Sequence, residues 1–158
     1  MTPDEIAQLA GLLRKLAGEG LGTPRMPLEV FRAMRGVVAQ PVVELLVSHT
    51  GRDVLLTPRH DADFQGHHLP GGFVGAGELL EHAVDRIARR ELGVSARLVR
   101  IAGHYVWEDH PFASPVSLLC HCNLDGEPHD GTLFDVAALP ADLIREHRVL
   151  IEAFWPPR

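Results

Sequence analysis

Several features are scarce or missing in this chain of 158 residues, and each absence excludes a class of protein. No apolar run approaches the length that spans a bilayer, although 46% of the residues are hydrophobic, so we expect a soluble protein with no membrane partner. There is no basic block and the net charge is −6, which argues against nucleic acid as the main partner. The residues from Met1 to Glu5 lack a positive segment followed by an apolar one, so we expect no secretory signal.

Cysteine is scarce as well, with Cys120 and Cys122 as the only two. In a strand, both thiols would point to one face together with Leu118 and Leu124, and His121 would point to the other face. One interpretation is a Cys-His-Cys metal site, and the other is a pair of small apolar core residues. We favour the second, because a period of two separates the histidine from the thiols. Reduced thiols fit a cytoplasmic protein.

The first part of the chain is predicted to be helical. Residues 3–17 form an amphipathic pattern with Thr2 as its cap, and a shorter helix is expected over residues 28–34. A glycine- and proline-rich break at residues 18–27 separates the two. We treat residues 1–38 as an N-terminal helical extension, which packs either on the rest of the chain or on a second subunit in a homodimer.

The remaining residues, 39–158, are predicted to form one domain with enough volume for a core. Strand patterns cover residues 41–48, 53–57, 96–107, 116–124 and 132–136. One central helix follows Glu78, and a closing helix covers residues 143–154. Strands combined with one central and one terminal helix predict an α+β sandwich.

The most informative stretch runs from Gly71 to Val94. Gly71 and Gly72 follow a proline and predict a sharp turn with positive φ and close backbone approach. From Glu78 onward, apolar residues recur at three- and four-residue spacing, which predicts a helix with one apolar face. Gly93 is a natural stop for that helix. Such a loop and helix can hold a hard divalent cation between carboxylates and backbone carbonyls.

This stretch resembles the signature of the Nudix hydrolases, G-x5-E-x7-R-E-U-x-E-E-x-G-U, where U is a bulky aliphatic residue. The matching positions are Gly72, Glu78, Arg86, Glu91, Gly93 and Val94. Two acidic positions depart from the pattern, because Ile87 and Arg90 stand where the family has glutamates. The resemblance implies the Nudix-type αβα sandwich with a mixed β-sheet.

The resemblance also implies a divalent metal, Mg²⁺ or Mn²⁺, on the carbonyl of Gly71 and the side chain of Glu91. A single ion is expected, since Ile87 offers no ligand and the charge of Arg90 opposes a second cation. Four residues that match the signature are expected to have structural roles: Gly72, Glu78, Arg86 and Gly93. A salt bridge between Glu78 and Arg86 would brace the loop.

GDP-mannose mannosyl hydrolases, one branch of the family, show a similar loss of two glutamates. They attack carbon 1 of the sugar with a histidine base from a loop before the last strand, and His129 aligns with that base. Pro128 stands where the branch has a metal-ligating amide, and Glu127 is the candidate substitute. Arg59 matches an arginine that neutralises the leaving diphosphate.

Three functions stay open. The first is a metal-dependent hydrolase of a nucleoside diphosphate linked to another group, such as a sugar, with His129 activating water. The second is attack at phosphorus, with Glu127 or Glu78 as the base. The third is a binding module that senses a nucleotide or metabolite without turning it over.

His67 and His68 are candidates for contacts with the base or the sugar of a substrate. Strand alternation would point one of them toward the ligand cleft and the other away from it.

Overall fold

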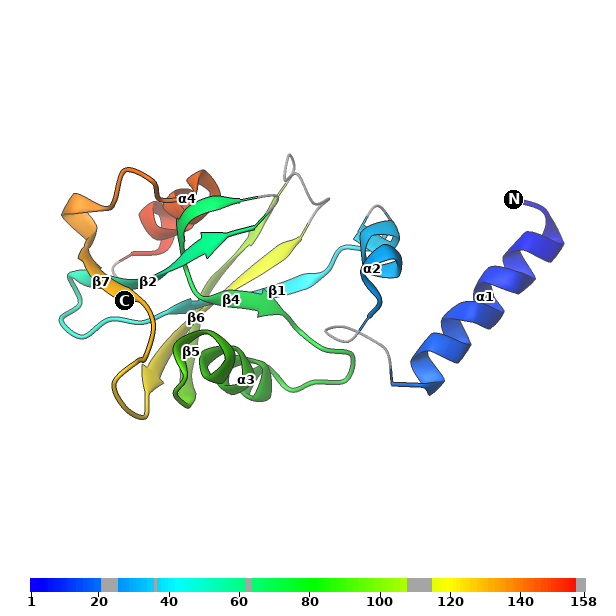
Figure 1. Ribbon diagram of the computed structural model, residues 1–158, viewed down its shortest axis with the longest axis horizontal. Coiled ribbons are helices and arrows are strands. Elements are labelled where there is room, and N and C mark those ends of the chain that lie inside the picture. Colours follow the sequence, from blue (N-terminus) through cyan, green and yellow to red (C-terminus); the bar gives the residue numbers. More distant parts are fainter. Residues whose placement is uncertain (21–25, 36, 62–63, 108–114, 156–158) are drawn as a thin grey trace.

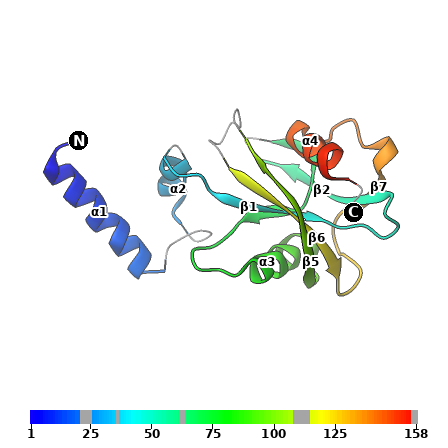
Figure 2. The same ribbon diagram turned by 180° about the vertical axis from the view of Figure 1, so that it is seen from behind.

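The computed structural model describes residues 1–20, 26–35, 37–61, 64–107 and 115–155. Its elements in chain order are α1 (Pro3–Gly18), α2 (Leu28–Arg35), β1 (Pro41–Leu46), β2 (Asp53–His60), β3 (Gln65–His68), β4 (Gly71–Phe73), α3 (Leu80–Leu92), β5 (Ala96–Val106), β6 (Val116–Leu124), β7 (Thr132–Asp135), a 3₁₀ turn (Val136–Ala138) and α4 (Arg145–Phe154). In Figures 1 and 2, α3 lies on one side of the strands and α4 on the other. The α+β sandwich expected from the sequence is confirmed.

The strands form two sheets. The larger has the order β4-β1-β6-β5, in which β1 runs parallel to β6 while the other neighbours are antiparallel, so it is the expected mixed sheet. The smaller has the order β3-β2-β7 and is antiparallel. Pairing of β1 with β4 sets Glu44 of β1 directly opposite Gly71, the first residue of β4.

Alternation along β1 divides the core into two layers. Val43 and Leu45 face the cluster under α3, which also contains Ile87 and both cysteines. Leu46 faces the second cluster, together with Leu150 and Ile151 of α4. Glu44 alternates in the same sense as Leu46 and therefore belongs to the α4 side of the sheet.

The two cysteines are core residues, as predicted. Cys120 and Cys122 are buried and free, and burial raises the pKa of the Cys120 thiol to about 12. Thiols held protonated in an apolar layer are poor metal ligands. In the part of the chain that the structure describes, no group of three or more His, Cys, Asp or Glu side chains could hold a metal ion.

Helix α1 is capped as expected but buries none of its residues. Thr2 accepts a hydrogen bond from the Glu5 amide, and the Glu5 carboxylate accepts one from the Thr2 amide. Figures 1 and 2 show α1 standing apart from the sandwich, with Ile6 and Leu12 more than half exposed on its apolar stripe. Packing of α1 on the domain is therefore not what the structure has, and the homodimer stays a prediction. Across the described residues, no helix is long and apolar enough to cross a membrane.

Two local predictions around α3 need correction. The helix begins at Leu80 rather than at Glu78. Glu78 belongs to the preceding loop, where its carboxylate accepts a hydrogen bond from the amide of Gly75 at 2.7 Å. The expected positive φ at Gly71 and Gly72 is wrong, since both lie in the extended backbone of β4. Gly93 does end the helix in the left-handed conformation, with φ of 71°.

Candidate active site

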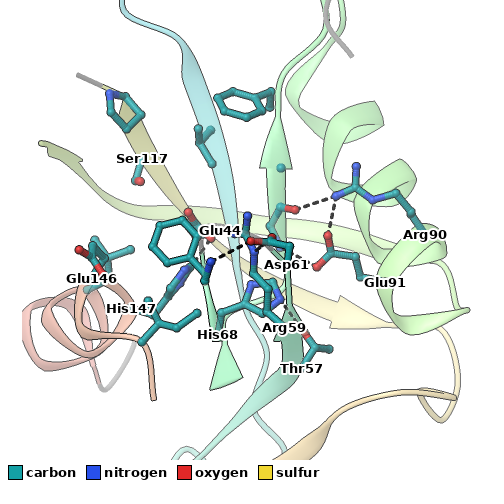
Figure 3. Close-up of a pocket in the computed structure, with 18 of the residues that line it drawn as sticks. Glu44, Thr57, Arg59, Asp61, His68, Arg90, Glu91, Ser117, Glu146 and His147 are labelled. Carbon is teal, nitrogen blue, oxygen red and sulfur yellow. Dashed lines mark hydrogen bonds and ion pairs between the residues drawn. The ribbon is translucent and has the colours of Figure 1, made fainter. Parts of the chain in front are cut away.

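A cleft of about 780 Å³ opens between β1, β4, the end of α3, β2 and α4 (Figure 3). Its charged and ionisable lining includes Glu44, Arg59, His68, Arg90, Glu91 and His147. These side chains come from five elements that are far apart in the sequence, so only the assembled fold brings them together. An apolar end is formed by Phe31 of α2 and Phe73 of β4, whose rings pack edge to face at 4.8 Å.

Gly71 and Glu91 lie side by side, as the predicted metal site requires. The amide of Gly71 donates a hydrogen bond to Glu91 Oε2 at 3.0 Å. The other carboxylate oxygen, Oε1, accepts from Arg90 Nη2 at 2.5 Å, and the same nitrogen donates to the carbonyl of Gly71 at 2.8 Å. Figure 3 shows both of these contacts at the edge of the cleft. One nitrogen therefore touches both atoms that the resemblance assigns to the metal.

Close approach, rather than unusual φ, explains the two glycines. A Cβ atom on Gly71 would overlap Glu44 Oε2 and lie 2.9 Å from the carbonyl of Val43. A Cβ atom on Gly72 would lie 2.8 Å from Arg90 Nη2 and 3.4 Å from Ile87 Cγ1. The contact at Gly71 includes the backbone of Val43, so glycine is required there, whereas at Gly72 the close atom is the flexible end of Arg90, which a side chain would displace.

The salt bridge between Glu78 and Arg86 is present and braces the loop before α3. Arg86 Nε donates to Glu78 Oε1 at 2.7 Å, and Arg86 Nη2 donates to Glu78 Oε2 at 2.8 Å and to the carbonyl of Phe73 at 2.9 Å. The paired guanidinium lowers the pKa of the Glu78 carboxyl. Neither side chain lines the cleft, which fits the structural role expected for both.

Glu44 is a cleft residue that the sequence reasoning missed. It is 7% exposed, and its Oε2 has no hydrogen-bond partner among the described residues. Burial, followed by the negative charge of Glu91, raises the pKa of this carboxyl well above its ordinary value of 4.5. The available signal was a single acidic residue inside the apolar run from Val42 to Val47, because a buried carboxyl group is rare outside functional sites.

Two histidines stand beside Glu44 in the cleft wall. His147 Nδ1 lies 3.8 Å from Glu44 Oε2 and accepts a hydrogen bond from the Leu69 amide at 3.3 Å. His68 Nε2 is hydrogen-bonded to Thr57 Oγ1 at 3.1 Å, and the two imidazole rings are 5.4 Å apart. Burial, followed by the charge of Arg59, lowers the pKa of His68 to about 4, so this ring is neutral at physiological pH.

The orientation of the histidine pair is thereby settled. His68 lines the cleft, whereas His67 points away and pairs with Asp142 Oδ1 at 2.9 Å through Nδ1. The ring of His67 packs edge to face against Phe134, with the ring centroids 5.1 Å apart. Of the two substrate-contact candidates, only His68 is in a position to meet a ligand in this cleft.

Arg59 lines the cleft, and its guanidinium is already paired with Asp61. Its Nε lies 2.5 Å from Asp61 Oδ2, and its guanidinium stacks over the ring of Phe64 at 4.6 Å from the centroid. Stacking and pairing fix the guanidinium at the cleft wall, where a phosphate group could take over from the carboxylate.

The structure does not bring His129 and Glu127 into the cleft lining. Both are exposed, and the His129 ring lies against Gly93, where an added Cβ would be 2.6 Å from Nδ1. The His129 amide donates to the carbonyl of Leu92 at 2.8 Å, which ties this loop to the end of α3. The loop reaches the cleft through the next residue, Asp130. The catalytic roles expected for His129 and Glu127 remain predictions.

The donor set fits one hard divalent cation. The carbonyl of Gly71, the Glu91 carboxylate and the partnerless Oε2 of Glu44 are all oxygens, which Mg²⁺ and Mn²⁺ prefer. The position that contacts both Gly71 and Glu91 is the one that Arg90 Nη2 takes. An ion on that pair therefore needs a different rotamer of Arg90, which is half exposed and has room to turn.

Comparison with known proteins agrees with this fold. The family model described as NUDIX domain matches residues 38–154. Among solved structures, the MutT NUDIX hydrolase from Burkholderia pseudomallei superposes with a TM-score of 0.62 at 23% identity, covering 73% of this chain and 97% of that one. The MutT protein from Methanosarcina mazei gives 0.60 at 20% identity, covering 73% and 92%. An ADP-ribose pyrophosphatase from Streptococcus suis gives 0.50 at 18% identity, with the same coverage.

A comparison with curated proteins found no match. The structural neighbours are too distant in sequence to show more than the fold, but the family model covers well over half of the chain. The family match and the hydrolase neighbours together support the prediction of a hydrolase. The chain belongs to the NUDIX domain family.

Proposed function

We propose that the protein is a divalent-metal-dependent hydrolase of a nucleoside diphosphate linked to another group, such as a sugar. The observation that carries this proposal is the cleft itself, in which the oxygens of Gly71 and Glu91 lie beside two guanidinium groups, those of Arg59 and Arg90. Oxygen ligands and arginines together are what a metal-bound diphosphate needs. The Streptococcus suis neighbour acts on ADP-ribose by its name, a compound of this class.

The cleft offers a distinct place to each part of such a substrate. Phe31 and Phe73 form its apolar end and suit the flat face of a nucleobase, and Trp107 also lines the cleft. Arg59 and Arg90 would bind the diphosphate, and the carbonyl of Gly71 with the Glu91 carboxylate would hold the ion. A bound Mg²⁺ or Mn²⁺ would supply charge neutralisation as the diphosphate leaves. Burial of Glu44 and His68 keeps this wall poor in water.

Two sets of residues are candidates for the base that accepts a proton from the attacking water. His129 is the prediction for attack at carbon, and its loop borders the cleft only through Asp130. Glu44 and His147 both line the cleft, and either is an alternative acceptor for a proton from water bound there. For attack at phosphorus, Glu127 and Glu78 were the candidates. Glu78 is committed to Arg86, which argues against its use as a base.

The test is a substrate panel of nucleoside diphosphate sugars, dinucleotides and nucleoside triphosphates, each with Mg²⁺, with Mn²⁺ and with EDTA. Glu91→Gln should lower turnover at least about 10²-fold, because it removes a charged ligand at the reacting group. Glu81→Gln, an exposed position on the same helix, is the matched control and should leave turnover unchanged. Turnover that survives EDTA or Glu91→Gln would end the metal-dependent proposal.

Hydrolysis in ¹⁸O-labelled water separates the two directions of attack. Label in the released sugar means attack at carbon, and label in a phosphate product means attack at phosphorus. A binding module without turnover is the second candidate function, and Arg90 favours it, since its guanidinium already fills the place between Gly71 and Glu91. Tight binding of a panel compound with no hydrolysis under any metal condition would select that candidate.

A further inference from the structure

We propose that the guanidinium of Arg90 is a built-in cation of this cleft, and that a divalent ion binds to Gly71 and Glu91 only by displacing it. The inference rests on the metal site proposed above, but it concerns how that site is occupied and not what the protein hydrolyses. From the sequence alone, Arg90 was expected to repel a second ion. The contacts of its side chain show that it competes with the first.

The competition follows from shared atoms. Arg90 Nη2 sits 2.8 Å from the carbonyl oxygen of Gly71 and 2.5 Å from Glu91 Oε1. A divalent ion on the same two oxygens would stand about 2.0–2.6 Å from each, and so within the volume of that nitrogen. The guanidinium and the ion cannot both hold the pair, and their like charges add to the exclusion.

The fold makes a place for this guanidinium. Gly72 has no Cβ, and a Cβ there would stand 2.8 Å from Nη2 and 3.5 Å from Nη1, so the guanidinium occupies space that a side chain at this position of β4 would take. On its other side, Arg90 lines the cleft, and half of its side chain is exposed. The Arg90 side chain thus rests beside Gly72 of β4 and has space to turn outward into the cleft.

Arg89 provides a built-in comparison one position earlier on the same helix. Its Nε donates to Asp85 Oδ2 at 2.8 Å and its Nη2 donates to Ser95 Oγ at 2.8 Å, away from Gly71 and Glu91. Successive residues of a helix point about 100° apart, which is why one arginine meets the cleft and the other does not. Removing either charge changes the net charge equally, but only Arg90 touches the proposed ligands.

Mn²⁺ titration of the full chain, by calorimetry and by water-proton relaxation, tests the proposal without any substrate. The variants are Arg90→Gln, Arg90→Met, Arg89→Gln and the double variant Arg90→Gln with Glu91→Gln. Both Arg90 variants should bind Mn²⁺ at least about tenfold more tightly than the parent, or about 1.4 kcal/mol. Arg89→Gln should stay within about threefold, the size of a surface charge effect. The double variant should lose the gain.

Each other result overturns the inference. Equal or weaker Mn²⁺ binding in both Arg90 variants would show that Arg90 does not compete. An equal gain in Arg89→Gln would show a general effect of charge, and a gain kept in the double variant would place the ion away from Glu91. If Arg90→Gln gains affinity while the substrate panel stays silent, the hydrolase proposal fails and this inference stands. If the parent already binds Mn²⁺ as tightly as Arg90→Gln, this inference fails and the hydrolase proposal stands.

Discussion

Replacing Glu44 by Gln should stabilise the protein while impairing its cleft. The carboxyl is 7% exposed, its Oε2 has no partner among the described residues, and Glu91 adds a second negative charge nearby. These conditions favour the protonated acid, which is why the pKa of Glu44 is raised well above 4.5. A glutamine keeps the shape of the side chain and carries no charge beside Glu91.

The magnitude follows from the buried charge that glutamine removes. A buried polar group without a partner destabilises a fold by about 1–3 kcal/mol. For a domain of this size, that corresponds to about 3–10 °C in melting temperature. Because the folded pKa is raised, Glu44 is neutral in both states at low pH and its penalty is absent there. The penalty develops as pH rises from the unfolded value of 4.5 through the folded one, so the gain from glutamine should grow with pH.

Thermal melts in EDTA at about pH 4 and about pH 8 measure this dependence. Glu152→Gln is the matched control, because Glu152 is exposed on α4 and should show no gain at either pH. Turnover and Mn²⁺ affinity of Glu44→Gln should both fall while its melting temperature at the higher pH rises. A loss of stability at the higher pH would refute the reasoning, since it would reveal an ionised Glu44 held by a protonated His147.

Three further outcomes are expected. Arg86→Ala should lower the free energy of unfolding in urea by about 2–3 kcal/mol, because it leaves the carboxylate of Glu78 half-buried without its two charge-assisted hydrogen bonds, and an unchanged midpoint would contradict the brace. Asp53, whose pKa is lowered to about 2 chiefly by the hydroxyl of Ser48, contributes stability that is present above its ordinary 3.8 and lost as pH falls toward 2. In acid titrations, Asp53→Asn should therefore cost about 1 kcal/mol at neutral pH after allowance for solvent screening, and progressively less as pH falls through 2. Ile87→Val should cost about 0.5–1.5 kcal/mol in stability and leave turnover unchanged, and lost turnover at an unchanged melting temperature would contradict its packing role.

The sequence predicted best the features that depend on neighbours along the chain. Helical spacing after Glu78, the stop at Gly93 and the brace to Arg86 are all local, so periodicity and the motif register were sufficient. The strand period likewise placed Cys120 and Cys122 on one buried face. In each case, the partner lies within a few residues or within the same element, where backbone geometry fixes the contact.

Features that depend on long-range register were missed. Glu44 meets Gly71 because β1 pairs with β4, and it meets His147 because α4 docks on that face of the sheet. Nothing local in the chain specifies either contact. The same reason explains the error over the glycines, which were read as turn residues when their role is close approach across strands and to α3. The position of His129 was inferred from alignment with a branch of the family, and the fold places its ring at the end of α3.

Arg59 and Arg90, two arginines of the cleft, are both paired with carboxylates before any ligand enters. Arg90 is held by Glu91, and Arg59 by Asp61, so each guanidinium already has a carboxylate. A diphosphate that binds these arginines must take them from their carboxylates, and each exchange frees carboxylate oxygens that then lack a cation. The freed Glu91 is the residue on which the divalent ion is expected, beside the partnerless oxygen of Glu44. If the protein binds a metal and a diphosphate as we propose, entry of the anion should therefore favour entry of the metal, and by linkage entry of the metal should favour the anion. This coupling would act on a helix that keeps only Glu91 of the three glutamates that follow the arginine in the Nudix signature.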